Sequence, residues 1–264
     1  MDLMNSLIAL HKLDGYIQSI FLAEHTDGFM LLDGCSRPDV SLVISFIEQT
    51  LGRKKEDLKL VVVTHMHPDH AGGANLFRKL TGCKLAAANV SGQWYGGVSG
   101  TIMHWTDIAL AQYVAKRKER PFSRIWYART LSPDIKLEDG EKIPGFKEWT
   151  AHFTQGHTDR DLSLHHISSD RIYIADLIVK VKDKYFPPVP VSYPNRYKRS
   201  LEKLRQLGPK EVILAHGAET PIEMIDFDYL LQRAPNEPLT QWKVIWKNIH
   251  ERLLFNMFKK KDRP

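Results

Sequence analysis

Cysteine is scarce in this chain. Cys35 and Cys83 are the only two among 264 residues, and neither belongs to a Cys-x-x-Cys pair, so a disulfide framework is excluded. No apolar run approaches the roughly 20 residues that span a bilayer. The first residues also lack the basic and apolar regions of a signal peptide. We therefore expect a folded protein of the cytoplasm with no transmembrane segment.

Excess charge of one sign is small as well. The chain has 37 Lys and Arg against 31 Asp and Glu, a net charge of +6. Part of the excess lies in two blocks, 116–120 and 259–263, which a solvated helix face and a chain terminus explain. This balance permits an anionic partner but does not require one. We expect a small-molecule substrate and no nucleic acid.

The predicted elements alternate in the order of a layered α/β protein. The run at 58–63 ends in three consecutive β-branched residues, Val61–Val63, which is typical of a strand buried on both faces. Apolar residues at helical spacing predict the helices. Strands are expected over 16–22, 29–32, 58–63, 83–88, 146–153, 162–167, 171–175 and 211–215, and helices over 37–51, 71–80, 105–120, 195–207 and about 240–258.

Two segments interrupt this order. Residues 91–133 begin with a glycine-rich stretch, are rich in aromatic side chains, and would form an insert that serves as a lid or as a packing element. The amphipathic helix at 240–258 is predicted from apolar residues at Trp242, Ile245, Trp246, Ile249, Leu253 and Met257. We expect it to dock on the domain or, like the insert, to form a homodimer contact; a membrane surface is the lesser alternative.

Histidine is concentrated in one place. The strand at 58–63 runs into Thr64-His65-Met66-His67-Pro68-Asp69-His70, which holds three imidazoles and a carboxylate within six residues. Such crowding is unfavourable unless something binds these groups, because the imidazoles repel when charged and lack partners when neutral. Three further candidates, His157, Asp176 and His216, each follow a predicted strand. Together these residues make a coordination set at one edge of the sheets.

These residues, in this order, closely resemble the metallo-β-lactamase superfamily of His-x-His-x-Asp-His metal-dependent hydrolases. The resemblance runs from about Tyr16 to Gly217 and includes all seven ligand positions of the two-metal members. It implies an αββα sandwich, with residues 1–220 as the hydrolase domain, 91–133 as the insert and 221–264 as a C-terminal helical extension. It also implies that one metal is held by His65, His67 and His157, the other by Asp69, His70 and His216, and that Asp176 bridges them.

The chain departs from the family pattern at a few positions. Ala175 and Ala215 stand where glycine is usual, and Asp159-Arg160-Asp161 follows the third motif where the family has other residues, which suggests an altered site mouth. Asp33 falls where the family has a structural aspartate, and we interpret it as a turn or supporting residue rather than a ligand.

The implied chemistry is hydrolysis by a metal-bridging hydroxide. Five imidazoles and two carboxylates suit two divalent ions, first of all Zn²⁺, with Fe or Mn as alternatives. Two such ions share a water, lower its pKa and polarise the bond under attack. Asp69 would be the catalytic residue, because it would orient the hydroxide and take its proton in addition to binding metal.

Several reactions are compatible with this ligand set. We expect a small ester-, lactone- or thioester-like substrate, bound against an aromatic wall formed by Phe186, Tyr193, Tyr197 and Trp94. The alternative for these aromatic residues is that they pack the interior. The alternative functions are a nuclease or phosphodiesterase, a mononuclear-iron persulfide dioxygenase, and a non-catalytic member of the same fold that binds nucleic acid.

Overall fold

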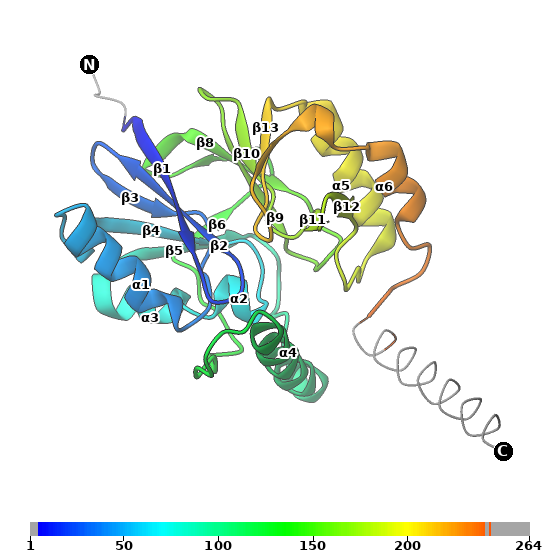
Figure 1. Cartoon of the computed structure of the whole chain (residues 1–264), viewed down its shortest axis with the longest axis horizontal. Coiled ribbons are helices and arrows are strands. Elements are labelled where there is room, and N and C mark those ends of the chain that lie inside the picture. The colour runs from blue at the N-terminus through cyan, green and yellow to red at the C-terminus, as the bar shows by residue number, and fades with distance from the viewer. Residues whose placement is uncertain (1–4, 241–242, 244–264) are drawn as a thin grey trace.

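Residues 5–240 and residue 243 are described by the computed structural model. They form two six-stranded sheets that pack face to face with helices on both outer sides (Figure 1). The expected αββα sandwich is therefore confirmed. None of the helices in this part of the chain combines the length and the apolar character needed to cross a membrane.

The first sheet begins as an antiparallel meander and continues with parallel strands. Its strands lie side by side in chain order: Leu7–Asp14 (β1), Ser19–His25 (β2), Gly28–Leu31 (β3), Leu58–Val63 (β4), Lys84–Ala88 (β5) and Ile135–Leu137 (β6).

The second sheet is antiparallel except for one pair of neighbouring strands. Its strands are Lys142–Ile143 (β7), Phe146–Phe153 (β8), Leu162–His166 (β9), Arg171–Tyr173 (β10), Glu211–Ile213 (β13) and Glu219–Pro221 (β14), in the order β14-β13-β10-β9-β8-β7. β10 and β13 are its parallel pair. Val179–Val181 (β11) and Lys184–Phe186 (β12) make a separate hairpin.

The helices cover the sheets and carry the loops between them. They are Asp39–Ser45 (α1, continued by a π turn at Phe46–Thr50), Pro68–Ala71 (α2), Ala74–Thr81 (α3), Gly97–Arg117 (α4), Pro194–Leu207 (α5) and Phe227–Arg233 (α6), with single turns at Lys55–Asp57 and Ile222–Met224. α1 and α3 lie on the outer side of the first sheet, and α5 and α6 lie on the outer side of the second (Figure 1).

The central strand β4 shows why its sequence is apolar apart from the exposed Lys59. Leu58, Val61 and Val63 belong to the core under the helices, whereas Leu60 and Val62 belong to the core between the two sheets. Because successive side chains point to opposite faces, a strand covered on both sides needs apolar residues at every such position. β4 thereby holds the histidine loop that follows it at the buried centre of the first sheet.

The insert differs from its prediction in where its helix begins. α4 starts at Gly97 rather than at 105, within the stretch that its glycines suggested to be irregular. At Gly100 a Cβ atom would lie 2.2 Å from the backbone carbon of Tyr95, so glycine allows a close approach inside the helix rather than breaking it.

Other short elements were not predicted from the sequence: β1, β6, β7, β11, β12, β14 and α6. α6 lies in the range expected to be a C-terminal extension, and it packs with α5 through Phe227 and Leu230. Apart from Thr240 and Lys243, the helix predicted over 240–258 lies outside the described residues.

Candidate metal centre

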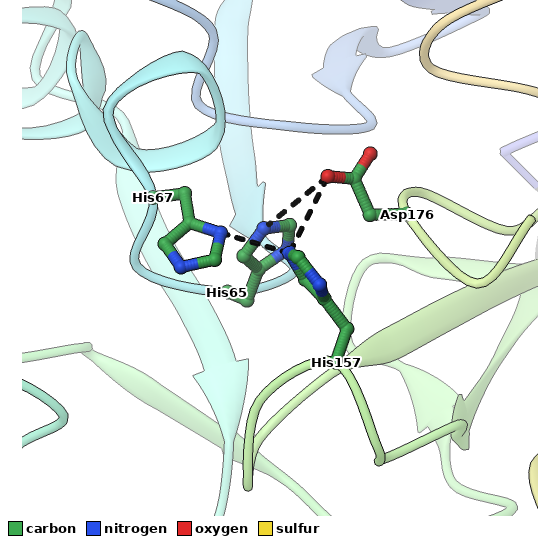
Figure 2. A group of neighbouring side chains, drawn as sticks. All are labelled: His65, His67, His157 and Asp176. Atoms are coloured by element: carbon green, nitrogen blue, oxygen red, sulfur yellow. Dashed lines mark hydrogen bonds and ion pairs between the residues drawn. The ribbon is translucent and has the colours of Figure 1, made fainter. Parts of the chain in front are cut away.

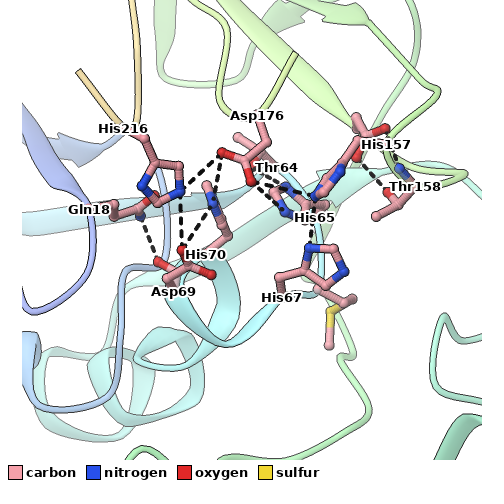
Figure 3. Close-up of polar contacts among 12 residues, drawn as sticks. Gln18, Thr64, His65, His67, Asp69, His70, His157, Thr158, Asp176 and His216 are labelled. Carbon is pink, nitrogen blue, oxygen red and sulfur yellow. Dashed lines mark hydrogen bonds and ion pairs between the residues drawn. The ribbon is translucent and has the colours of Figure 1, made fainter. Parts of the chain in front are cut away.

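The seven predicted ligand residues come together at one edge of the sandwich. They form the His–Asp cluster: His65, His67, Asp69, His70, His157, Asp176 and His216. Each of them follows the end of a strand, β4 for the first four and β8, β10 and β13 for the others. Figure 3 shows these side chains pointing toward one another from both sheets.

The cluster divides into two groups of side chains whose ligand atoms lie within 4.8 Å of one another. One group is His65, His67, His157 and Asp176, shown in Figure 2, and the other is Asp69, His70 and His216. In the first group, Nε2 of His157 lies 2.8 Å from Nδ1 of His67. In the second, Nε2 of His216 lies 3.2 Å from Oδ2 of Asp69.

Asp176 contacts both groups, with one carboxylate oxygen toward each. Its Oδ1 lies 3.3 Å from Nε2 of His70 and 3.3 Å from Nε2 of His216. Its Oδ2 lies 3.5 Å from Nε2 of His157 and 3.9 Å from Nε2 of His65. A carboxylate in this position has the geometry to serve two neighbouring cations at once.

The ring nitrogens that face away from the cluster have partners of their own. His70 Nδ1 donates to Asp33 Oδ2 at 2.6 Å, and His157 Nδ1 donates to the carbonyl oxygen of Pro190 at 2.6 Å. His65 Nδ1 donates to Thr64 Oγ1, which donates in turn to Asp33 Oδ2. Protonation of the outer nitrogen leaves a lone pair on the inner one, the state in which histidine binds a metal.

Electrostatics complete the site. Burial lowers the pKa of His65 far below its usual range and that of His67 to about 3, so both imidazoles are neutral. Burial acts in the same direction on His70 and His216, but Asp176 and other carboxylates outweigh it and raise the pKa of both. Burial would raise the pKa of Asp176, whereas His70 and His216 hold it well below its usual range. The neutral imidazoles of His65 and His67 and the ionised carboxylate of Asp176 attract cations, and His70 and His216 would give up a proton when a cation binds them.

The residues present fit a divalent metal. Nε2 of His65 is buried without a hydrogen bond, although it faces the cluster. Buried nitrogen atoms without partners are unfavourable, and a cation would satisfy them. Zn²⁺, Fe and Mn all bind to imidazole and carboxylate ligands, so the identity of the side chains does not determine which metal binds.

Asp107 is a site residue that the sequence analysis missed. It lies on α4, is buried, and its Oδ2 accepts from Tyr95 OH at 2.8 Å and lies 3.7 Å from Nε2 of His67. The insert thus places a carboxylate near the outer nitrogen of His67, at more than hydrogen-bond distance. One signal was available: among residues 85–115, Asp107 is the single Asp, Glu, Lys or Arg.

The unfamiliar residues after His157 support its loop. Asp161 Oδ2 accepts from the backbone nitrogens of Gly156 and Thr158, at 3.0 and 2.7 Å, and Oδ1 accepts from Thr158 Oγ1. Asp159 instead pairs with Arg160, at 2.7 Å. Asp161 therefore stabilises the turn that carries His157 and does not face the main cavity beside the cluster.

That cavity has a volume of about 650 Å³. His67, Asp69, His157, Asp176 and His216 form its floor. Its walls are aliphatic and rich in proline, and they include Leu110, Ala111 and Val114 of α4, Val179 and Val181 of β11, the stretch Pro187–Pro190, and Leu239.

Of the four aromatic residues predicted to line the site, Phe186 alone lines this cavity. Tyr197 is fully buried among α5 and α6, so the alternative of interior packing describes it. Trp94 lines a separate cavity of about 330 Å³, and the ring of Tyr193 lies under the guanidinium of Arg196. The structure thus brings one of the four predicted aromatic residues to this cavity, because the proline-rich segment and α4 occupy that side.

A family model for the metallo-beta-lactamase superfamily matches residues 13–216. The chain belongs to this superfamily. Within curated proteins it is similar to "Probable metallo-hydrolase YqjP" of Bacillus subtilis (strain 168), with 24% identity over 185 residues, 62% of this chain and 56% of that protein. The chain therefore matches little more than half the length of that relative.

Solved structures show the same fold. ST1585, an archaeal superfamily protein from Sulfolobus tokodaii, has a TM-score of 0.62 at 18% identity, with 85% of each chain covered. TTHA1429 from Thermus thermophilus has a TM-score of 0.59 at 20% identity and covers 97% of this chain and 83% of its own. TTHA1623, solved in a di-iron-bound form, has a TM-score of 0.55 at 17% identity, with coverage of 82% and 96%.

Ala175, at a position where the family resemblance predicts glycine, adopts a backbone conformation that glycine favours. Its φ angle is 43°, in the left-handed region, and the residue is buried. A side chain in that conformation costs roughly 1–2 kcal/mol because Cβ approaches the following carbonyl. The added methyl group therefore matters through the backbone conformation that it opposes rather than through its volume.

The contact between Asp107 and His67 predicts an effect on metal binding. In Asp107→Ala, affinity for Zn²⁺ should fall by about 10- to 100-fold, the usual effect of removing the outer partner of a ligating histidine. A competition titration of the metal-free protein with a chelating dye measures this. Asp107→Asn keeps an acceptor and should restore most of the affinity, and Thr106→Ala, on the same helix, should leave it unchanged. Equal affinities in Asp107→Ala and the wild type would show that Asp107 does not act on His67.

Proposed function

We propose that this superfamily member is a binuclear metallo-hydrolase of the cytoplasm that cleaves small ester, lactone or thioester substrates in the cavity beside the His–Asp cluster. The observation that carries the proposal is the position of Asp176, which presents one oxygen to each of two groups of ligand atoms. A single cation would be held by one group of ligand atoms alone, and the second group, Asp69, His70 and His216, would then have no cation to bind.

The two groups of ligand atoms indicate which residues would bind each cation. His65, His67 and His157 would hold one cation, Asp69, His70 and His216 the other, and Asp176 would bridge them; Zn²⁺ is the first choice of metal. When bound, two divalent cations lower the pKa of a coordinated water and polarise the bond that it attacks.

Asp69 is the proposed catalytic residue. Its carboxylate lines the cavity, and His70 and His216 outweigh the effect of burial and lower its pKa to about 2, so it is ionised. Gln18 Nε2 donates to the backbone carbonyl of Asp69 at 2.6 Å and holds this residue in place. We infer that Asp69 orients the attacking water, accepts its proton and returns that proton to the leaving oxygen or sulfur.

The cavity walls support the substrate class. A volume of about 650 Å³ lies in the range of small-molecule sites. Leu110, Val114 and Val179 offer apolar surface to an acyl chain. Arg233 is the one Lys or Arg among the described residues that line the cavity, whereas a nuclease needs several cations to hold a phosphate backbone.

The binuclear proposal predicts the metal content. Protein purified without chelator and supplemented with metal should carry about two equivalents of Zn, Fe or Mn per chain, measured by plasma emission spectrometry. His216→Ala should keep one of them, because His65, His67 and His157 remain. A wild-type protein that binds a single cation after supplementation would instead favour the mononuclear dioxygenase.

The role of Asp69 predicts a loss of turnover without a loss of fold. Asp69→Asn keeps the volume and one oxygen but removes the charge that accepts the proton. We expect turnover of the best ester substrate to fall by about 100-fold or more, the scale of a general base. Metal content and circular dichroism serve as controls. Wild-type turnover in this variant would leave Asp69 as a structural residue.

The apolar walls predict a dependence on acyl length. Each buried methylene contributes about 0.8 kcal/mol, so kcat/KM for p-nitrophenyl esters should rise several-fold from acetyl to butyryl and again to hexanoyl, with little effect of salt. Leu110→Asn, on the cavity wall, should flatten the series. Faster turnover of bis-p-nitrophenyl phosphate or RNA, with a steep loss as salt rises, would favour the nuclease.

A further inference from the structure

One face of α4 is apolar and exposed. Val98, Ile102, Trp105 and Tyr113 are exposed by 80, 50, 56 and 56%. The helix carries no charged residue before Lys116 except Asp107, which is buried. A helix that faces water normally carries charged side chains on that side. Figure 1 shows α4 at the margin of the molecule.

The chain that follows Thr240 begins beside this face. Leu239 and Val191 exchange two backbone hydrogen bonds of 2.9 and 3.0 Å, which fix the end of the described chain. Thr240 then lines the same 330 Å³ cavity as Trp94, Ile102 and Met103. Thr240 therefore lies beside the N-terminal half of α4.

Thr240 also makes the contact with which a helix starts. The backbone nitrogen of Lys243 donates to Thr240 Oγ1 at 3.4 Å, the pattern of an N-cap threonine and the third residue of a helix. The sequence beyond it, with apolar residues at helical spacing and Lys247 and Glu251 on the other side, is that of an amphipathic helix.

The two apolar patterns match in register. On α4, the small or apolar residues of the exposed face are Ile102, Trp105, Ala109 and Tyr113. In the C-terminal segment the same intervals of three, four and four residues separate Trp242, Ile245, Ile249 and Leu253. Each set spans about 17 Å of helix at 1.5 Å per residue. Ile249 falls opposite Ala109, where a small side chain leaves room for a large one.

We propose that residues 241–258 form a helix that packs on α4 of the same chain, parallel to it, with Trp242, Ile245, Ile249 and Leu253 over the exposed apolar face. The segment is the favoured occupant because it starts next to that face, so its local concentration exceeds that of a second copy or of a lipid surface. The opposite side of α4 carries Leu110, Ala111 and Val114, so this helix would brace a wall of the cavity.

A cysteine pair tests the register in the full-length protein. Ala109→Cys with Ile249→Cys places two thiols at the predicted contact, and Ala109→Cys with Glu251→Cys is the matched control, since position 251 lies on the opposite side of the helix. Cys35 and Cys83 are buried and can be retained. Under mild oxidation the first pair should form an intramolecular disulfide about tenfold faster or more than the control, as shown by peptide mapping of the monomer.

The alternatives give different products. Equal rates in the two pairs would overturn the proposal. A covalent dimer, or a cross-link between mixed Ala109→Cys and Ile249→Cys single variants, would place this face between two copies of the chain instead. If trypsin cleaves the segment rapidly in solution and slowly only when anionic phospholipid vesicles are present, the apolar face would be assigned to a membrane surface.

Charge variants test the same contact without engineered thiols. Lys247 and Arg252 are trypsin sites that the packed helix would protect. Ile249→Asp, in the segment, and Trp105→Asp, on α4, should each speed cleavage at these sites about tenfold or more, while Asn248→Asp, a neighbour off the contact, should not. Rapid cleavage in the wild type, or no change in both contact variants, would contradict the proposal.

Discussion

A buried carboxylate, Asp33, ties the two sheets together at the edge where the His–Asp cluster lies. It follows β3 and accepts hydrogen bonds from Thr64 and from Nδ1 of His70 on the first-sheet side, and from Tyr173 OH in β10 of the second sheet, at 2.8, 2.6 and 3.0 Å. Removal of one partner from such a buried ion pair leaves a charge without compensation, which costs about 3–5 kcal/mol. The orientation of His70 and the distance between the sheets thus depend on the same group.

This arrangement accounts for the chemistry of the cluster. Strands from two sheets end at one edge, so side chains more than a hundred residues apart in the chain converge without long loops. Partners on their outer nitrogens orient three imidazoles, and burial keeps His65 and His67 neutral. A site assembled in this way is organised before a cation arrives, because its ligands need little rearrangement to bind one.

The insert connects the site to the rest of the chain. One side of α4 offers Asp107 to His67 and aliphatic side chains to the cavity, while Ala111 and Ala115 pack against Tyr16 and Ile17. A single helix therefore lies beside a residue of the cluster and forms a wall of the cavity. Its remaining face is apolar and exposed, and the C-terminal segment is proposed to pack on it.

The sequence by itself determined the layered fold and the residues of the cluster. Periodicity located β4, β8 and α5 closely, because long regular patterns reflect burial on defined faces, and the spacing of histidines and aspartates singled out the cluster. Short edge elements such as β1 and β14 left too weak a pattern. Asp107 and the cavity walls were decided only by the tertiary structure. Whether a carboxylate reaches His67, or whether Tyr197 faces a substrate or the core, depends on how helices far apart in sequence pack together, and no local pattern records that.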